Sequence, residues 1–173
     1  MTASRQLAWH YTTGEWFQAI VESGVILPST AYIDPGEKPI VWFSLNSHWE
    51  QTANKRDLEA DGLRTLSMEE TAERCGGLVR FGVCPAVCPY TWRELKQLSG
   101  MSPRIAAALY RIGIEQGARP GQWRGTFKPV GRGYWRVVDV HQAGVWVRIP
   151  LNGEPAQHVS SLRLNSQEKS FEH

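Results

Sequence analysis

The 173-residue sequence contains no run of roughly 20 apolar residues, the length that a membrane-spanning helix requires. Its N-terminus also lacks the basic and then apolar layout of a secretion signal. Charge of either sign is in little excess, because 19 lysines and arginines face 17 aspartates and glutamates, for a net charge of +2. This balance does not by itself indicate a nucleic-acid or membrane partner. We therefore expect a cytoplasmic protein that has no membrane partner.

Cysteines are few, and the three in the chain are Cys75, Cys84 and Cys88. An odd number without a secretion signal favours reduced thiols over a disulfide framework. Cys84 and Cys88 stand four residues apart in CPAVC, but no histidine lies close to them in sequence to complete a zinc-binding set. We therefore expect small, partly buried thiols and no metal site.

Apolar residues are plentiful by contrast, at 42% of the chain, and eight of them are tryptophans. A chain of this length and composition can bury a core of its own, in which most tryptophans are expected to lie. No internal repeat or low-complexity segment divides the sequence. We expect one domain over residues 1–151 and a polar C-terminal tail over residues 152–173.

Hydrophobic patterning predicts an α+β fold built on a sheet of about six strands. The predicted strands span residues 7–11, 40–44, 78–83, 123–130, 134–141 and 145–149. We expect the last three to form a meander, with hairpin turns at GRG and QAG.

Predicted helices begin at capping signals, which include a serine or threonine followed three residues later by glutamate. These signals are Thr12 with Glu15, Ser67 with Glu70, Thr91 with Glu94, and Ser102 ahead of Pro103. In the first helix, Phe17, Ile20 and Val21 fall on one face at helical spacing. Gly24 is the expected end of that helix.

The junction after the first predicted strand carries an aromatic-flanked histidine, His10, directly before a helix start. A lone histidine at a strand end is more often structural than functional. Here, however, HYTT at residues 10–13 is followed by a helix that ends in SGVILPS and by a buried strand that ends in WFS. All three features fall within residues 1–44, and together they point to a function.

This layout resembles the NAD-binding half of the ADP-ribosyltransferase superfamily, which has small relatives among DNA-modifying toxins and RNA 2′-phosphotransferases. The resemblance covers residues 1–55 and continues beyond them only in strand order. It implies a split, mainly antiparallel central sheet with flanking helices, and NAD as a substrate. It also implies that His10 hydrogen-bonds the ribose beside nicotinamide. The residues that it assigns to NAD binding are His10, Tyr11, Thr12, Trp42, Phe43 and Ser44. We therefore expect His10 and Ser44 to lie at neighbouring strand ends and to face one cleft.

Cleavage of the bond between nicotinamide and ribose passes through an oxocarbenium-like state, which fixed hydrogen bonds and negative charge stabilise. The family completes its site with a carboxylate near the start of a later strand. In this sequence that position carries Gln122. An amide can hydrogen-bond a ribose hydroxyl, but it carries no charge and cannot act as a base.

Three carboxylates are candidates to replace the missing one. We rank Glu50 first, because it follows the second predicted strand closely and is flanked by His48 and Trp49. Glu115 lies a few residues before Gln122, whereas Asp139 lies inside a late strand and is expected to face solvent. For each of the three, an exposed position on a solvated surface is the alternative.

Two hypotheses from different classes follow. The first is an NAD-dependent mono-ADP-ribosyltransferase that modifies a macromolecular acceptor, either a protein or a nucleic acid. Its catalytic candidates are Glu50, Glu115 and Gln122. The second is a catalytically reduced binding module on the same scaffold, with exposed arginines and aromatics that grip a protein or nucleic-acid partner. These residues are Arg119, Arg124, Arg132 and Arg136 with Trp123, Tyr134 and Trp135.

Alternating arginine and tryptophan on a strand is also an ordinary way to build one wet and one dry face. The sequence leaves the acceptor and the oligomeric state open.

Overall fold

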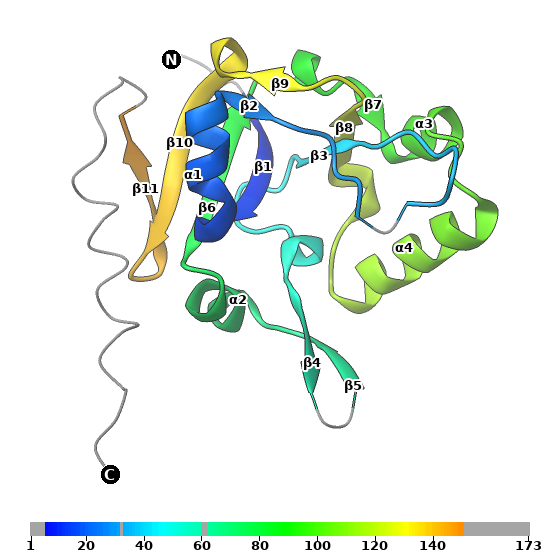
Figure 1. Ribbon diagram of the computed structural model, residues 1–173, viewed down its shortest axis with the longest axis horizontal. Coiled ribbons are helices and arrows are strands. Elements are labelled where there is room, and N and C mark those ends of the chain that lie inside the picture. The colour runs from blue at the N-terminus through cyan, green and yellow to red at the C-terminus, as the bar shows by residue number, and fades with distance from the viewer. Residues whose placement is uncertain (1–5, 32, 60–61, 151–173) are drawn as a thin grey trace.

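A computed structural model describes residues 6–31, 33–59 and 62–150 (Figure 1). Within these residues the chain forms a mixed α+β domain with four α-helices and a seven-stranded antiparallel sheet. The predicted tail, residues 152–173, lies outside the described residues. Among the described residues, no helix combines the length and the apolar character needed to cross a bilayer.

The main sheet contains the predicted strands, but not in the predicted arrangement, and the strand predicted over residues 123–130 ends at Thr126. In spatial order its strands are β11 (Val145–Ile149), β10 (Trp135–Gln142), β6 (Leu78–Val83), β1 (Ala8–Thr13), β3 (Val41–Ser44), β8 (Trp123–Thr126) and β7 (Tyr90–Thr91). Two small ribbons accompany it, β2 (Val25–Ile26) with β9 (Val130–Gly131) and β4 (Arg56–Glu59) with β5 (Gly62–Thr65).

The predicted three-stranded meander at the C-terminal end is wrong. Strands β10 and β11 do form a hairpin, and its two loop residues, Ala143 and Gly144, have the positive φ angles that such a tight turn needs. Strand β8, however, pairs with β3 and β7 at the other end of the sheet. The GRG segment forms a short 3-10 helix, Arg132–Tyr134, rather than a hairpin turn. Hydrophobic alternation predicts strands, but it does not say which strands pair.

Helix α1 (Gly14–Ser23) covers one face of the sheet, beside β1 and β6. Phe17 is buried there against Phe81, and Ile20 and Val21 pack against the same core, as predicted. Gly24 ends the helix in the left-handed conformation. The start was predicted one residue early, since Thr13 occupies the N-cap and its buried hydroxyl has no partner among the described residues.

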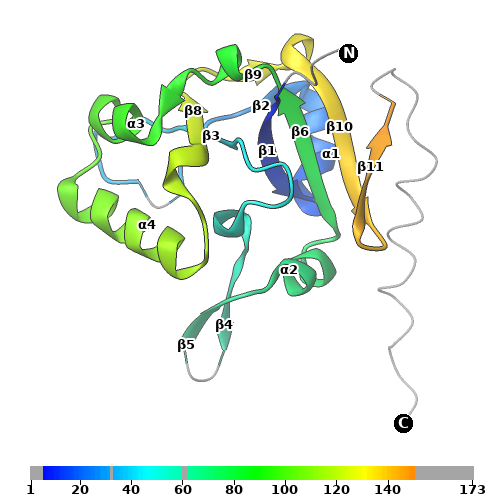
Figure 2. The same ribbon diagram turned by 180° about the vertical axis from the view of Figure 1, so that it is seen from behind.

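Helices α3 (Trp92–Leu98) and α4 (Pro103–Glu115) build a second core at the β8 end (Figure 2). Trp123 of β8 is buried in this core against Trp92. Gly113 of α4 gives the Trp123 ring its space, because a Cβ added there would lie 2.6 Å from two ring atoms. The second core therefore fixes the first residue of β8.

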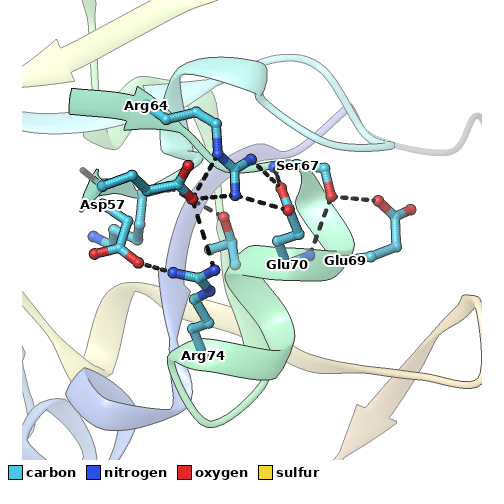
Figure 3. Close-up of polar contacts among 9 residues, drawn as sticks. Asp57, Arg64, Ser67, Glu69, Glu70 and Arg74 are labelled. Carbon is cyan, nitrogen blue, oxygen red and sulfur yellow. Dashed lines mark hydrogen bonds and ion pairs between the residues drawn. The ribbon is translucent and has the colours of Figure 1, made fainter. Parts of the chain in front are cut away.

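The β4–β5 hairpin, which the sequence analysis did not predict, projects away from the main sheet and its helices (Figures 1 and 2). Helix α2 (Met68–Arg74) holds it through ion pairs of Arg64 and Arg74 (Figure 3). The predicted capping box of Ser67 and Glu70 begins this helix.

Candidate functional site

The candidate site lies where β1, β3 and β8 meet. Strands β1 and β3 pair at a single register position, Trp9 with Ser44, whereas β1 and β6 pair at six. Strand β8 continues the sheet on the far side of β3, and the Leu45 N–H donates to the carbonyl of Gln122 at 2.9 Å. The start of β1, the end of β3 and the start of β8 are therefore adjacent, so His10 and Ser44 lie on neighbouring strands, as expected, although the HYTT end of β1 pairs with β6 and not with β3.

The side chains at this junction do not all share one face of the sheet. Because Trp9 pairs with Ser44, strand alternation places His10 and Ser44 on opposite faces. The expectation that His10 and Ser44 point into one cleft is therefore wrong. The NAD-binding candidates divide accordingly into His10, Thr12 and Phe43 on the α1 face, and Tyr11, Trp42 and Ser44 on the opposite face.

His10 lies between the diverging strands, with Nδ1 2.9 Å from the carbonyl oxygen of Trp42. A carbonyl oxygen only accepts, so Nδ1 carries the proton and Nε2 of the neutral ring is an acceptor. Burial lowers the pKa of His10 below its usual 6.5, which keeps the ring neutral. Nε2 has no hydrogen-bond partner among the described residues. His10 can therefore accept a hydrogen bond from a ligand hydroxyl.

Ser44 and Glu50 form a buried pair on the opposite face. The Ser44 hydroxyl donates to Oε2 of Glu50 at 2.6 Å, and Glu50 is 7% exposed. Its Oε1 accepts from the Thr52 hydroxyl at 3.0 Å and from the Trp123 indole at 3.2 Å. The predicted alternative of an exposed Glu50 is wrong. The carboxylate is fixed by β3, β8 and the short helix η1 (Gln51–Ala53).

A pocket of about 380 Å³ lies beside this pair. It is lined by Leu45, Asn46, Ser47, His48, Trp49, Gln51, Gly117, Arg119 and Gln122. Gln122 thus opens into a pocket, but neither His10 nor Ser44 lines it. Glu50 lies behind the pocket wall, because its neighbours Trp49 and Gln51 line the pocket while its own carboxylate bonds Ser44. The polar lining and Arg119 suit a polar or anionic ligand.

The other two carboxylate candidates lie elsewhere. Glu115 is exposed at the end of α4, where its Oε1 lies 3.9 Å from Nε of Arg111, and it does not line the pocket. Asp139 is 2% exposed and accepts from the guanidinium of Arg80 at 2.9 Å, so the expectation that it faces solvent is wrong. Arg80 in LVRFGV and Asp139 in VVDV are each a charged residue flanked by apolar residues within a predicted strand. That pattern could have predicted a buried ion pair.

Arg80 is the central residue that the sequence analysis missed. Its guanidinium lies 3.8 Å from the ring centre of Trp9 and 4.4 Å from that of Trp146. It also donates to the carbonyl of Ser47 in the pocket wall. Beside it, burial raises the pKa of Tyr11 to about 12, so the Tyr11 hydroxyl stays protonated and donates to Asn46 at 2.6 Å.

The proposed arginine and aromatic surface is only partly exposed. Trp123 and Trp135 are buried in the two cores, so neither can stack on a base. Tyr134 is 58% exposed and lies in sequence between Arg132 and Arg136, which are also exposed.

Burial raises the pKa of Cys88 to about 12, and no group of three or more potential metal ligands occurs in the described part of the chain.

Comparison of this chain with protein-family models, with curated proteins and with solved structures finds no match.

Proposed function

We propose that the protein is an NAD-dependent mono-ADP-ribosyltransferase, with Glu50 as the carboxylate at the reacting end. The observation that carries this proposal is the Ser44–Glu50 hydrogen bond of 2.6 Å. It joins the WFS strand end, where the family resemblance placed the pocket, to the carboxylate ranked first as the replacement at Gln122. Within this proposal Ser44 orients Glu50 instead of touching the nucleotide.

The chemistry requires a fixed negative charge near the ribose. In the reaction the bond between nicotinamide and ribose C1 breaks, and nicotinamide leaves with the electron pair. The cationic sugar is then attacked by an acceptor nucleophile, which loses a proton. Oε1 of Glu50 is occupied by donors from Thr52 and Trp123, whereas Oε2 accepts from Ser44 alone. Oε2 therefore retains acceptor capacity that can serve the sugar or its hydroxyls.

The pocket supplies the remaining contacts of the proposal. The Gln122 amide can hydrogen-bond a ribose hydroxyl, and the Arg119 guanidinium can pair with a phosphate. His10 offers its Nε2 acceptor on the other face of the same junction. Calorimetry with NAD on His10→Ala and on Gln122→Ala distinguishes the two faces. The variant that loses affinity marks the face occupied by the nucleotide, and unchanged affinity in both contradicts the nucleotide site.

The deciding experiment is transfer of label from NAD to protein or nucleic acid in a cell extract. Glu50→Gln should lower transfer by about 100-fold or more, the scale of a lost electrostatic contact to the transition state, while NAD still binds. Glu115→Gln is the matched control, since it removes an exposed carboxylate that does not line the pocket. Equal transfer by the two variants, or no transfer by the wild-type protein, would refute the proposal.

A second candidate is a binding module without transferase activity. It is favoured by the burial of Glu50, which is 7% exposed and already accepts four hydrogen bonds from the protein, and by the neutral amide at Gln122. This candidate predicts tight binding of a protein or nucleic-acid partner with neither transfer nor release of free ADP-ribose. Free ADP-ribose without labelled macromolecule would instead indicate an NAD hydrolase.

A further inference from the structure

Three consecutive backbone carbonyls in the pocket wall accept hydrogen bonds from side chains of three different strands. Tyr11 of β1 donates its hydroxyl to the carbonyl of Asn46 at 2.6 Å. Trp146 of β11 donates its indole N–H to the carbonyl of His48 at 2.8 Å. Residues 45–50 form a loop, named here the 45–50 loop. These two bonds hold both ends of the segment 46–48 within it.

Arg80 of β6 completes the set between them, because its guanidinium donates to the carbonyl of Ser47. The guanidinium is itself fixed, since it bonds Asp139 at 2.8 and 2.9 Å and lies between the rings of Trp9 and Trp146. A planar group with five donors can make all of these contacts at once, whereas a lysine ammonium cannot.

The 45–50 loop connects these bonds to the candidate site. The backbone N–H of Asn46 donates to the Ser44 hydroxyl at 3.1 Å, and that hydroxyl in turn donates to Glu50. The Asn46 side chain donates to the carbonyl of Trp49 at 2.6 Å. A change in the path of residues 46–48 would therefore move both the pocket wall and the Glu50 carboxylate.

We propose that Arg80 is a positioning residue, which sets the path of the 45–50 loop and through it the place of Glu50 and of the pocket wall. Within the described residues Arg80 makes no hydrogen bond or ion pair to Glu50 or to a side chain that lines the pocket, so it acts through the Ser47 carbonyl. Only the consequence for NAD rests on the proposed function. The consequence for the loop stands on the contacts alone.

The test compares Arg80→Lys with Arg148→Lys. Arg148 is the matched control because it also bonds Asp139, at 3.2 Å, but its side chain is 63% exposed and it forms no hydrogen bond to the 45–50 loop. The readout is the NMR resonance of the Trp123 indole N–H, which donates to Glu50 and so reports on the carboxylate. Hydrogen exchange of the Asn46 and His48 amides reports on the loop.

Arg80→Lys should shift the Trp123 indole resonance and accelerate exchange of the loop amides by about 10- to 100-fold, the effect of a lost charge-assisted hydrogen bond. Arg148→Lys should leave both within about 2-fold of wild type. A folded Arg80→Lys protein with the wild-type resonance and wild-type exchange would overturn the proposal. A change of equal size in both variants would also overturn it, since the effect would then come through Asp139.

Two further variants keep the test decisive if Arg80→Lys does not fold. Tyr11→Phe and Trp146→Phe each remove one donor to the loop and keep an aromatic ring. Each should accelerate loop exchange by about 3- to 10-fold, as expected for a neutral hydrogen bond. Wild-type exchange in both would overturn the claim that these bonds set the loop.

NAD titration of the same samples separates this proposal from the proposed function. If the wild-type protein binds NAD, Arg80→Lys should bind it at least about 10-fold more weakly, and Arg148→Lys should not. If the wild-type protein does not bind NAD while Arg80→Lys still shifts the loop, the positioning role is supported and the proposed function is refuted.

Discussion

Two arginines, Arg80 and Arg64, bond carboxylates through the same guanidinium fork in different surroundings. The side chain of Arg80 is 10% exposed and is enclosed by two indole rings, with Asp139 as its carboxylate partner. The side chain of Arg64 is 39% exposed on the β4–β5 hairpin and bonds Glu70 and Glu59 (Figure 3). The chemistry of the two contacts is alike, and burial distinguishes them.

Burial changes what the loss of a partner costs. A buried charge whose partner is removed has no water to replace it, so the remaining group is strongly unfavourable. An exposed charge is solvated again at once, and salt screens its interaction. We infer that Arg80 and Asp139 are needed for the candidate site to keep its shape, whereas the Arg64 contacts hold a hairpin at the surface.

The largest expected effect is that of Asp139→Ala. It leaves the guanidinium of Arg80 buried beside two indoles without a counter-charge, which should lower the free energy of unfolding by about 3–5 kcal/mol. Denaturant unfolding measures this change. Arg148→Ala, which removes the exposed partner of the same carboxylate, should cost less than about 1 kcal/mol. Similar losses in the two variants would remove the distinction drawn from burial.

A double replacement, Arg80→Met with Asp139→Leu, tests whether the unpaired charge is the cause of that loss. Both charges are absent from this variant, and its side chains can pack against Trp9 and Trp146. We expect a loss of no more than about 2 kcal/mol, less than that of Asp139→Ala. Denaturant unfolding under the same conditions provides the comparison. A larger loss than in Asp139→Ala would assign the stability to the Ser47 contact instead.

The sequence predicted the individual elements better than their assembly. The strands, the α1 face of Phe17 and two of the glutamate capping boxes are local patterns, and the structure confirms them. The pairing of β8 with β3 depends on contacts far apart in the chain, which periodicity does not encode. The hairpin β4–β5 was missed because its strands are short and charged.

For the candidate site, too, the local features were predicted better than their arrangement in space. His10 and Ser44 were correctly predicted to lie on neighbouring strands, but they were not correctly predicted to share a face, since a one-residue difference in register moves a side chain to the other face. Glu50 was ranked first from its neighbours in sequence, and the structure joins it to Ser44. Its NAD chemistry stays a prediction.

His10 extends the comparison to a titratable group that bonds a backbone carbonyl and has no carboxylate partner among the described residues. Because burial lowers the pKa of His10 below 6.5, the unfolded chain takes up a proton before the folded protein does. Stability should therefore fall as the pH drops from 6.5 toward the lowered pKa. Calorimetric melting between pH 7 and 5 should show this decline in the wild-type protein and a weaker decline in His10→Gln. Parallel curves would contradict the neutral imidazole.

The smallest expected effect belongs to Glu70, the exposed partner of Arg64. The bonds from Arg64 and the Ser67 backbone lower the pKa of Glu70 from 4.5 to about 2. A lowered carboxyl pKa stabilises the fold above pH 4.5, and this contribution is lost as the pH falls from 4.5 to 2. Glu70→Gln should remove that part of the acid transition, and about 1 M salt should largely suppress the difference.

Glu69→Gln is the control, because Glu69 accepts a hydrogen bond from the Ser67 hydroxyl but forms no ion pair with an arginine in the described residues. An acid transition that is equally reduced in both variants would assign the effect to the helix N-terminus and not to the Arg64 fork. A difference that survives high salt would mean that the exposed pair is shielded from water as Arg80 is, and burial would then no longer separate the two arginines.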